Sequence, residues 1–201
     1  GTFMAKRFFE TFPALILEDE LKDLFEFAEV TALKYNRDRT AIHVYLLCRR
    51  LISKPQIYAV ESKIEKQMFP DGDMKIRIFE SFSLSEQYTP SYLVDVYKDS
   101  LFAEIKRRSD LDYHILMRAD WKVADDDSLL LTLEDSLWAR NRAGELREWI
   151  QMVFYDRCAI SIPVAVSFKE RDTTAIEEEK KRAEAQAIAR IMKANSVASK
   201  D

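Results

Sequence analysis

The chain has 201 residues, 47% of them hydrophobic, with 31 basic and 35 acidic side chains and a net charge of −4. This apolar fraction can build a packed core, so wholesale disorder is excluded, and the length allows one domain or two small ones. The chain holds only three glycines, where average usage predicts roughly 14, so glycine-rich phosphate loops and dinucleotide-binding turns are excluded.

Several further classes of protein are disfavoured by what the sequence lacks. No apolar run approaches the ~20 residues of a membrane span, and the N-terminus has no secretory apolar region. Cys48 and Cys158 lie in separate apolar runs, where buried, unreactive thiols in a reducing compartment are expected. We therefore expect a soluble cytoplasmic protein without membrane contact. The net negative charge argues against strong electrostatic binding of nucleic acid.

Residues 1–83, which carry no net charge, predict a first α+β module. Apolar spacing predicts the first helix, runs rich in Val, Ile, Tyr and Thr predict strands, and a serine before Pro55 predicts a capped helix start. The expected elements are a helix over 21–28, strands over 29–35 and 40–48 joined by a polar turn, a helix capped by Ser53 and a strand over 75–79.

Residues 84–172, with a net charge of −5, predict a second module in the same α–β–β–α–β order. The polar stretch 83–87 places the boundary between the modules, and separate apolar stripes favour two units that fold independently. The expected elements are a helix from Thr89–Pro90, a short helix over 111–118, strands over 121–123 and 128–133, a short helix over 135–140, a turn over 141–144, a longer helix through Phe154 and a strand over 160–168.

Residues 173–201 have no strand signal and are typical of a solvated, charged helix. Glu177 and Glu178 precede Lys181 and Arg182 at the favourable i, i+4 spacing. We expect a linker helix towards the rest of a longer polypeptide, with residues 195–201 frayed.

No group of side chains predicts catalysis or a metal site. The adjacent carboxylates of Asp125–Asp127 would point to alternate sides of a strand, so a solvated turn is the favoured interpretation. His43 and His114 have no serine or cysteine nearby in a nucleophile context. We expect no catalytic residue, no metal ligand and no cofactor within these residues.

The turn expected at 141–144 suggests a nucleic-acid site. The surrounding order of helices and strands resembles a type II KH domain, in which a GXXG turn between two helices clamps a nucleic-acid backbone. Asn141 replaces the first glycine, Gly144 supplies the second, and Arg140 and Arg142 could contact phosphates. Two interpretations stay open here: weak binding of single strands, or a KH-like scaffold used for protein contacts.

The expected hairpin predicts a docking surface for a protein. Ile42, Val44 and Leu46 would occupy one face of its second strand, and bulky residues would also occupy the other face, namely His43, Tyr45 and Leu47. A two-stranded hairpin under one helix buries a single face, so the second apolar face is free to bind a partner. The alternative is that the second module or the first helix covers it.

The second half of the chain resembles the N-terminal region of PolC, the replicative DNA polymerase III alpha subunit of low-GC Gram-positive bacteria. The resemblance runs through nearly the whole chain and is clearest from about Lys75 to Arg182. Four short stretches and the charged helix carry it: LSEQYTP at 84–90, VYKDS at 96–100, LTLED at 131–135 and ISIPV at 160–164.

This resemblance implies two N-terminal modules, the second KH-like, ahead of an OB domain, a PHP domain with an inserted exonuclease and the polymerase core. It implies that the parent polypeptide is an enzyme, a DNA-directed DNA polymerase with 3′–5′ proofreading that needs Mg²⁺, while its metal-binding aspartates lie outside these 201 residues. It also implies contacts with replisome proteins, with the clamp-loader tau subunit as a candidate partner. We therefore expect a non-catalytic protein-interaction module, with weak single-stranded DNA binding as the alternative.

Overall fold

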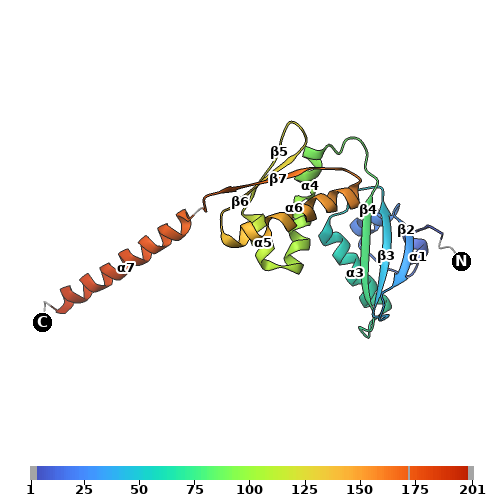
Figure 1. Cartoon of the computed structure of the whole chain (residues 1–201). Helices are drawn as coiled ribbons and strands as arrows, with labels where there is room; N and C mark the ends of the chain where they lie inside the picture. Colours follow the sequence, from blue (N-terminus) through green and yellow to red (C-terminus); the bar gives the residue numbers. More distant parts are fainter. Residues whose placement is uncertain (1–3, 172, 199–201) are drawn as a thin grey trace.

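The computed structural model describes residues 4–171 and 173–198 and confirms the α+β class (Figure 1). Within these residues, seven helices accompany two mixed sheets of four and three strands. The elements are β1 (Lys6–Arg7), α1 (Phe8–Thr11), α2 (Asp19–Phe25), β2 (Glu29–Tyr35), β3 (Ala41–Cys48), α3 (Lys54–Met68), β4 (Lys75–Phe82), α4 (Pro90–Arg108), α5 (Asp110–Met117), β5 (Asp120–Val123), β6 (Leu129–Glu134), α6 (Leu137–Cys158), β7 (Val164–Lys169) and α7 (Thr174–Ala198).

The two sheets are built on the same plan. In the first, of order β1-β2-β3-β4, β2 and β3 form an antiparallel hairpin and α3 connects β3 to the parallel strand β4. In the second, of order β5-β6-β7, β5 and β6 are antiparallel and α6 connects β6 to the parallel strand β7. A helix precedes each hairpin, so the α–β–β–α–β order predicted for both halves is confirmed.

Polar side chains begin the helices where the sequence predicts. Ser53 accepts a hydrogen bond from the Gln56 backbone N–H, the Gln56 side chain reaches back to the Ser53 backbone, and Pro55 lies in the first turn of α3. The Thr89 side chain caps α4 by accepting a hydrogen bond from the Tyr92 backbone N–H, and proline occupies the first position of that helix. These contacts satisfy backbone N–H groups that have no partner inside a helix.

Each connecting helix also satisfies the free edge of the strand that follows it. Glu61 and Glu65 of α3 accept hydrogen bonds from the backbone N–H groups of Ile78 (2.7 Å) and Ile76 (3.1 Å) in β4. In the second sheet, Gln151 of α6 accepts from the Val164 N–H of β7 at 2.8 Å. An edge strand whose donors are occupied is protected from pairing with another chain.

Three expectations from the sequence are wrong. The short helix over 135–140, the turn over 141–144 and the longer helix form the single helix α6, capped by Ser136. Gly144 has an ordinary helical backbone with open space around it, so nothing breaks the helix there. The last strand begins only at Val164, after Pro163, and α7 continues through Ala198, so residues 195–198 are helical. Residues 199–201 lie outside the described residues.

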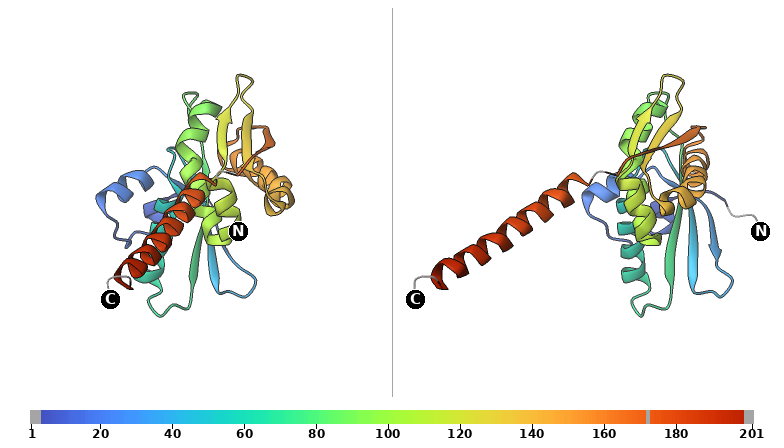
Figure 2. Two further views of the ribbon diagram at one scale, coloured as in Figure 1. Left: turned by 90° about the vertical axis from the view of Figure 1, so that its left-hand side faces the viewer. Right: turned by 60° about the vertical axis from the view of Figure 1, so that its left-hand side comes forward.

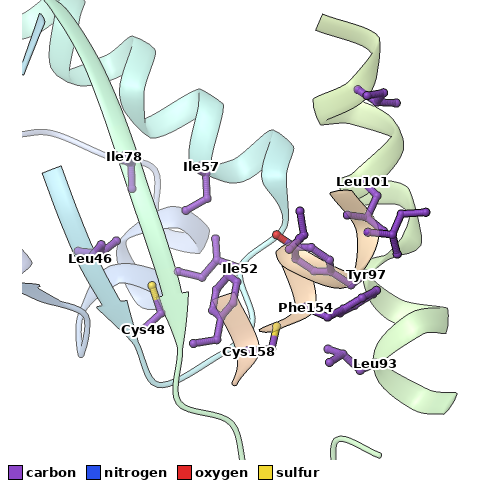
Figure 3. Packing of buried hydrophobic residues seen from close by; sticks show 14 of the residues in the cluster. Leu46, Cys48, Ile52, Ile57, Ile78, Leu93, Tyr97, Leu101, Phe154 and Cys158 are labelled. Carbon is purple, nitrogen blue, oxygen red and sulfur yellow. The ribbon is translucent and has the colours of Figure 1, made fainter. Parts of the chain in front are cut away.

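Buried side chains form one continuous cluster across both sheets. We call the residues up to the end of β4 the first part of the chain and the residues from α4 to β7 the second part. Figure 3 shows where the two parts meet: Ile52, Tyr97, Phe154 and Cys158 gather between β4 and α4. The Tyr97 ring makes edge contacts with Phe82 of the first sheet and with Phe154 of α6. The chain passes from one part to the other between the end of β4 at Phe82 and the start of α4 at Pro90, where the sequence places the module boundary.

Four charged side chains lie in this same interface: Lys54 and Glu80 are buried, and Glu104 and Arg157 are partly buried. The Lys54 ammonium lies 2.9 Å from a Glu80 oxygen and 3.7 Å from a Glu104 oxygen, and the Arg157 guanidinium donates to Glu104 at 2.6 Å. Because Lys54 and Glu80 belong to the first part and Glu104 and Arg157 to the second, each part holds one cation and one carboxylate of the cluster.

The helix α7 differs from the rest of the chain. It extends away from both sheets (Figures 1 and 2), and none of its described residues is buried. Within the described part of the chain, no helix combines the length and the apolar character needed to cross a membrane.

Candidate interaction surface

The first sheet presents one side to its packed core and the other to solvent. Strand register pairs Lys34 with His43 and Arg77, and Ala32 with Tyr45 and Phe79. Side chains at paired positions point to the same side of a sheet. We call the solvent side the outer face and define it by the residues Arg7, Glu29, Ala32, Lys34, His43, Tyr45, Leu47, Lys75, Arg77, Phe79 and Ser81.

The alternation along β3 shows that the two sides differ in burial. Val44 and Leu46 are buried in the core, whereas His43, Tyr45 and Leu47 are half-buried. Phe79, on the neighbouring strand, is 44% exposed. The predicted docking residues His43, Tyr45 and Leu47 therefore lie together on a partly solvent-accessible face. Their role in binding a protein stays a prediction.

Aromatic rings form the centre of the outer face. The rings of Tyr45 and Phe79 are stacked, with centroids 5.1 Å apart and planes 17° apart. The His43 ring contacts Phe79 edge-on, with centroids 5.0 Å apart. From the other side, the Lys34 ammonium lies 5.1 Å from the Tyr45 ring centroid, within the range of cation–π attraction. Two adjacent strands, β3 and β4, thus contribute the rings of one ordered cluster, and β2 contributes the ammonium group that lies over it.

Basic side chains share the outer face with these rings. Arg7, Lys34, Lys75 and Arg77 are all exposed, and within the described residues none of them forms an ion pair with a carboxylate. Glu29 is the outer face's carboxylate, and it lies 3.8 Å from the Arg49 guanidinium. The outer face therefore has a local positive charge, although the whole chain is net negative.

Lys34, Arg77 and Phe79 were not predicted from the sequence as members of this face. The alternation of Lys75–Ile76–Arg77–Ile78–Phe79 contained the signal, because it places the lysine, arginine and phenylalanine on one side of β4. Their position beside His43 and Tyr45 depends on the parallel pairing of β4 with β3, which strand periodicity alone does not specify.

The second predicted site, at Arg140 to Gly144, lies within the first two turns of α6 rather than in a turn. Arg140 donates two hydrogen bonds to Asp135, at 2.7 and 2.9 Å, and its guanidinium lies 4.4 Å from the Phe168 ring centroid. This contact with Asp135 raises the pKa of Arg140 and lowers the pKa of the carboxyl.

Arg142 is also engaged with carboxylates. It donates to both oxygens of Asp112 on α5, at 2.9 and 3.1 Å, and to Glu145 one turn along α6. The Asp112 carboxylate is buried, so the Arg142 contact ties α5 to α6. Both arginines already have carboxylate partners. The GXXG-like turn is replaced by continuous helix, so the backbone geometry on which the KH-like interpretation depended is absent. Single-strand binding by Arg140, Asn141, Arg142 and Gly144 stays a prediction.

Other chemically suggestive residues do not converge. Asp126 accepts hydrogen bonds from Ser128 in the turn between β5 and β6, and no set of three or more His, Cys, Asp or Glu side chains suited to a metal ion occurs among the described residues. Burial raises the pKa of both Cys48 and Cys158 to about 12, so neither thiol is poised as a nucleophile near neutral pH.

Comparison with known proteins places the first sheet in a family. Residues 7–78 match the family model of the DNA polymerase III polC-type N-terminus I domain. The chain contains a PolC-type N-terminus I domain. The matched stretch begins in β1 and ends within β4, so it holds α1 to α3 and most of the outer face, while Phe79 follows it directly. No curated protein matches the chain.

The family match supports the resemblance noted in the sequence, in a part of the chain where that resemblance was less clear. The resemblance was clearest from Lys75 to Arg182, whereas the matched residues end at Ile78. Together the two observations identify an N-terminal region of a PolC-type DNA polymerase III alpha subunit. The packing of both sheets into one cluster joins the PolC-type domain to the residues that follow it.

Proposed function

We propose that this PolC-type region is a non-catalytic interaction module, which docks the polymerase onto other replisome proteins through the outer face of the first sheet. The observation that carries this proposal is the partly exposed aromatic cluster of His43, Tyr45 and Phe79. Apolar rings kept at a surface mark interaction sites more often than isolated exposed residues do. The opposite side of the same sheet is packed, so the rings are held on a rigid support.

The partner is expected among proteins that meet the polymerase in the cytoplasm during replication. The clamp-loader tau subunit is our candidate, because the family resemblance implies replisome contacts at this end of the polypeptide. DNA synthesis and proofreading, with their Mg²⁺ ions, are assigned to other parts of the parent polymerase. The 201-residue chain itself is expected to incorporate no nucleotide and to remove none.

A pulldown with the purified 201-residue chain tests the proposal. The immobilised chain is incubated with purified clamp-loader subunits, and the wild type is compared with the double variant Tyr45→Ala with Phe79→Ala. We expect the wild type to retain a clamp-loader subunit and the variant to lose it, because large aromatic side chains supply much of the binding energy at protein interfaces.

Tyr155→Ala is the matched control, since Tyr155 is a 64% exposed tyrosine on α6, remote from the outer face in sequence. Circular dichroism establishes that each variant is folded. Retention of the clamp loader by the double variant and by wild type alike would remove the outer face from the interaction. Retention of no replisome protein, together with binding of single-stranded DNA, would favour the alternative function.

A further inference from the structure

The charges of the outer face point to the chemistry of its partner. We infer that the outer face binds an extended, acidic peptide segment of a partner protein, with an apolar side chain placed against the ring cluster and carboxylates placed on the surrounding basic residues. This inference rests on the proposed function, because it specifies the ligand of the same surface.

The first argument is charge complementarity. Arg7, Lys34, Lys75 and Arg77 come from three of the four strands and lie on the same face as the rings. Lys34 and Arg77 flank His43 in the strand register, whereas Arg7 pairs with Glu29 and its guanidinium lies 5.9 Å from the Phe27 ring centroid. The carboxylate of the face, Glu29, lies next to Arg49. Four exposed cations without carboxylate partners in the described chain repel one another and are stabilised when an anionic partner arrives. A neutral or basic partner would gain nothing from this arrangement.

The second argument separates an acidic peptide from a single-stranded nucleic acid, the other common polyanion. Proteins bind single strands by stacking bases on open ring faces. The Tyr45 ring has its two faces occupied, by Phe79 from β4 and by the Lys34 ammonium from β2, which flank β3 on opposite sides. Aromatic ring edges carry partial positive charge, which attracts carboxylate oxygens rather than the π faces of bases.

The third argument concerns the shape of the ligand. The outer face is a sheet surface with small or medium side chains, Ala32, Leu47 and Ser81, beside the rings. The positions around the aromatic centre therefore offer a shallow apolar strip bordered by cations. An extended segment alternates the direction of its side chains, so it can direct an apolar group towards the rings while its neighbours reach Lys34 or Arg77.

Fluorescence anisotropy with the 201-residue chain tests this inference. The probe is a labelled twelve-residue peptide of Asp and Glu with a central Leu–Phe pair, and its counterpart has Asn and Gln in place of the acids. A labelled dT12 oligonucleotide supplies the second polyanion. We expect the acidic peptide to bind, the neutral peptide to bind at least about tenfold more weakly, and the affinity of the acidic peptide to fall with added salt.

Charge reversal locates the site. Lys34→Glu with Arg77→Glu is expected to weaken binding of the acidic peptide by about tenfold or more, since two favourable contacts become repulsive. Lys122→Glu with Arg147→Glu changes the net charge equally at exposed positions of the second part and is expected to leave binding within about twofold of the wild type.

Three results of the anisotropy measurements would overturn the inference: equal effects of the two double variants, equal affinity for the acidic and neutral peptides, or tighter binding of dT12 than of the acidic peptide. The last result would assign the face to single-stranded nucleic acid. The proposed function has its own readout, because Lys34→Glu with Arg77→Glu is also taken through the clamp-loader pulldown. Retention of the clamp loader by that variant would sink the acidic-peptide site while leaving a protein-interaction role intact.

Discussion

Lys54 and Glu80 show how single residues hold the two parts of this chain together. The exposed fractions of their side chains are 7% and 2%, and both also face charges from the second part, Glu104 and Arg157. Burial alone would raise the pKa of Glu104, but the hydrogen bond and positive charge of Arg157 lower it, which keeps the carboxylate ionised. The cluster holds two cations and two carboxylates, so the loss of any one of them leaves an unbalanced charge.

Replacing Glu80 should therefore be costly. In Glu80→Ala the Lys54 and Arg157 cations share the single carboxylate of Glu104, and removing one partner from a buried ion pair costs about 3–5 kcal/mol. We expect the urea midpoint to fall by an amount that corresponds to this loss of the free energy of unfolding. Lys169→Ala breaks the exposed pair with Asp120 (3.0 Å) and should cost less than about 1 kcal/mol. A similar loss of the free energy of unfolding in both variants would contradict this expectation and would mean that water screens the charges of the interface cluster.

The two cysteines provide a prediction about pH. Burial, reinforced for Cys48 by the negative charge of Glu80, raises the pKa of each thiol from 9.0 to about 12. In the folded chain a thiol reagent should react slowly at pH 8, and two thiols should react at once after unfolding in urea. Because the unfolded chain releases these protons first, the thiols' contribution to stability is complete below pH 9 and is lost as pH rises towards 12. Fast labelling of the folded chain at pH 8 would contradict their burial.

Short-range residue patterns correctly predicted structural features that depend only on neighbouring residues, such as helix caps. The caps at Ser53 and Thr89 were confirmed, because a side chain that satisfies helical N–H groups acts within four residues of itself. The interface cluster of Lys54, Glu80, Glu104 and Arg157 could not be predicted in this way. Its members are separated by 24 to 103 positions and meet only through the packing of four different elements.

At the scale of whole elements, the unbroken α6 is the clearest departure from expectation. Asn141 and Gly144 have low helix propensities, and a short sequence window therefore favoured a turn. The helix is continuous because Ala139, Leu146 and Trp149 bury one face along its length. Arg142 reinforces it by binding Asp112 of α5. Tertiary packing thus outweighed a local preference worth about 1 kcal/mol per glycine.

Two glycine substitutions test this account of α6. Gly144→Ala should raise the free energy of unfolding by about 0.5–1 kcal/mol, because alanine is the better helix former and its Cβ would meet no atom within 4 Å. Gly72→Ala should instead destabilise by about 1 kcal/mol, since Gly72 has φ +74° in the turn before β4. The two effects are read from urea unfolding curves, and a loss of stability in Gly144→Ala would point to a backbone at 144 that is not helical.

At the scale of the whole molecule, the repeated α–β–β–α–β plan was predictable because each strand and helix carries its own periodicity. The relation between the two sheets was not, because it depends on side chains such as Ile52 and Tyr97 that look like ordinary core residues of their own halves. The outer face was likewise predicted only in part. Its β3 residues followed from the alternation along the hairpin, whereas its β4 residues could be placed only once the strand order was known.

The shared interface leads to a prediction about cooperativity. The separate apolar stripes of the two halves favour independent folding, whereas the continuous core and the buried charges favour one unfolding unit. We expect tryptophan fluorescence, which reports on the second part through Trp121, Trp138 and Trp149, and hydrogen exchange at β3 of the first part to give the same transition in urea. Two separated transitions would show that the interface is too weak to couple the sheets.

The helicity of α7 should depend on temperature and salt more than that of the other helices. It has no buried residue, and its 25 residues span about 37 Å when fully helical. Without a core to hold it, its order depends on intrinsic propensity and on contacts such as the pair of Arg182 with Glu179. The end-to-end distance of α7 therefore depends on conditions. Warming or added salt shifts the helix–coil equilibrium along α7 and changes this distance, while the two sheets keep their dimensions.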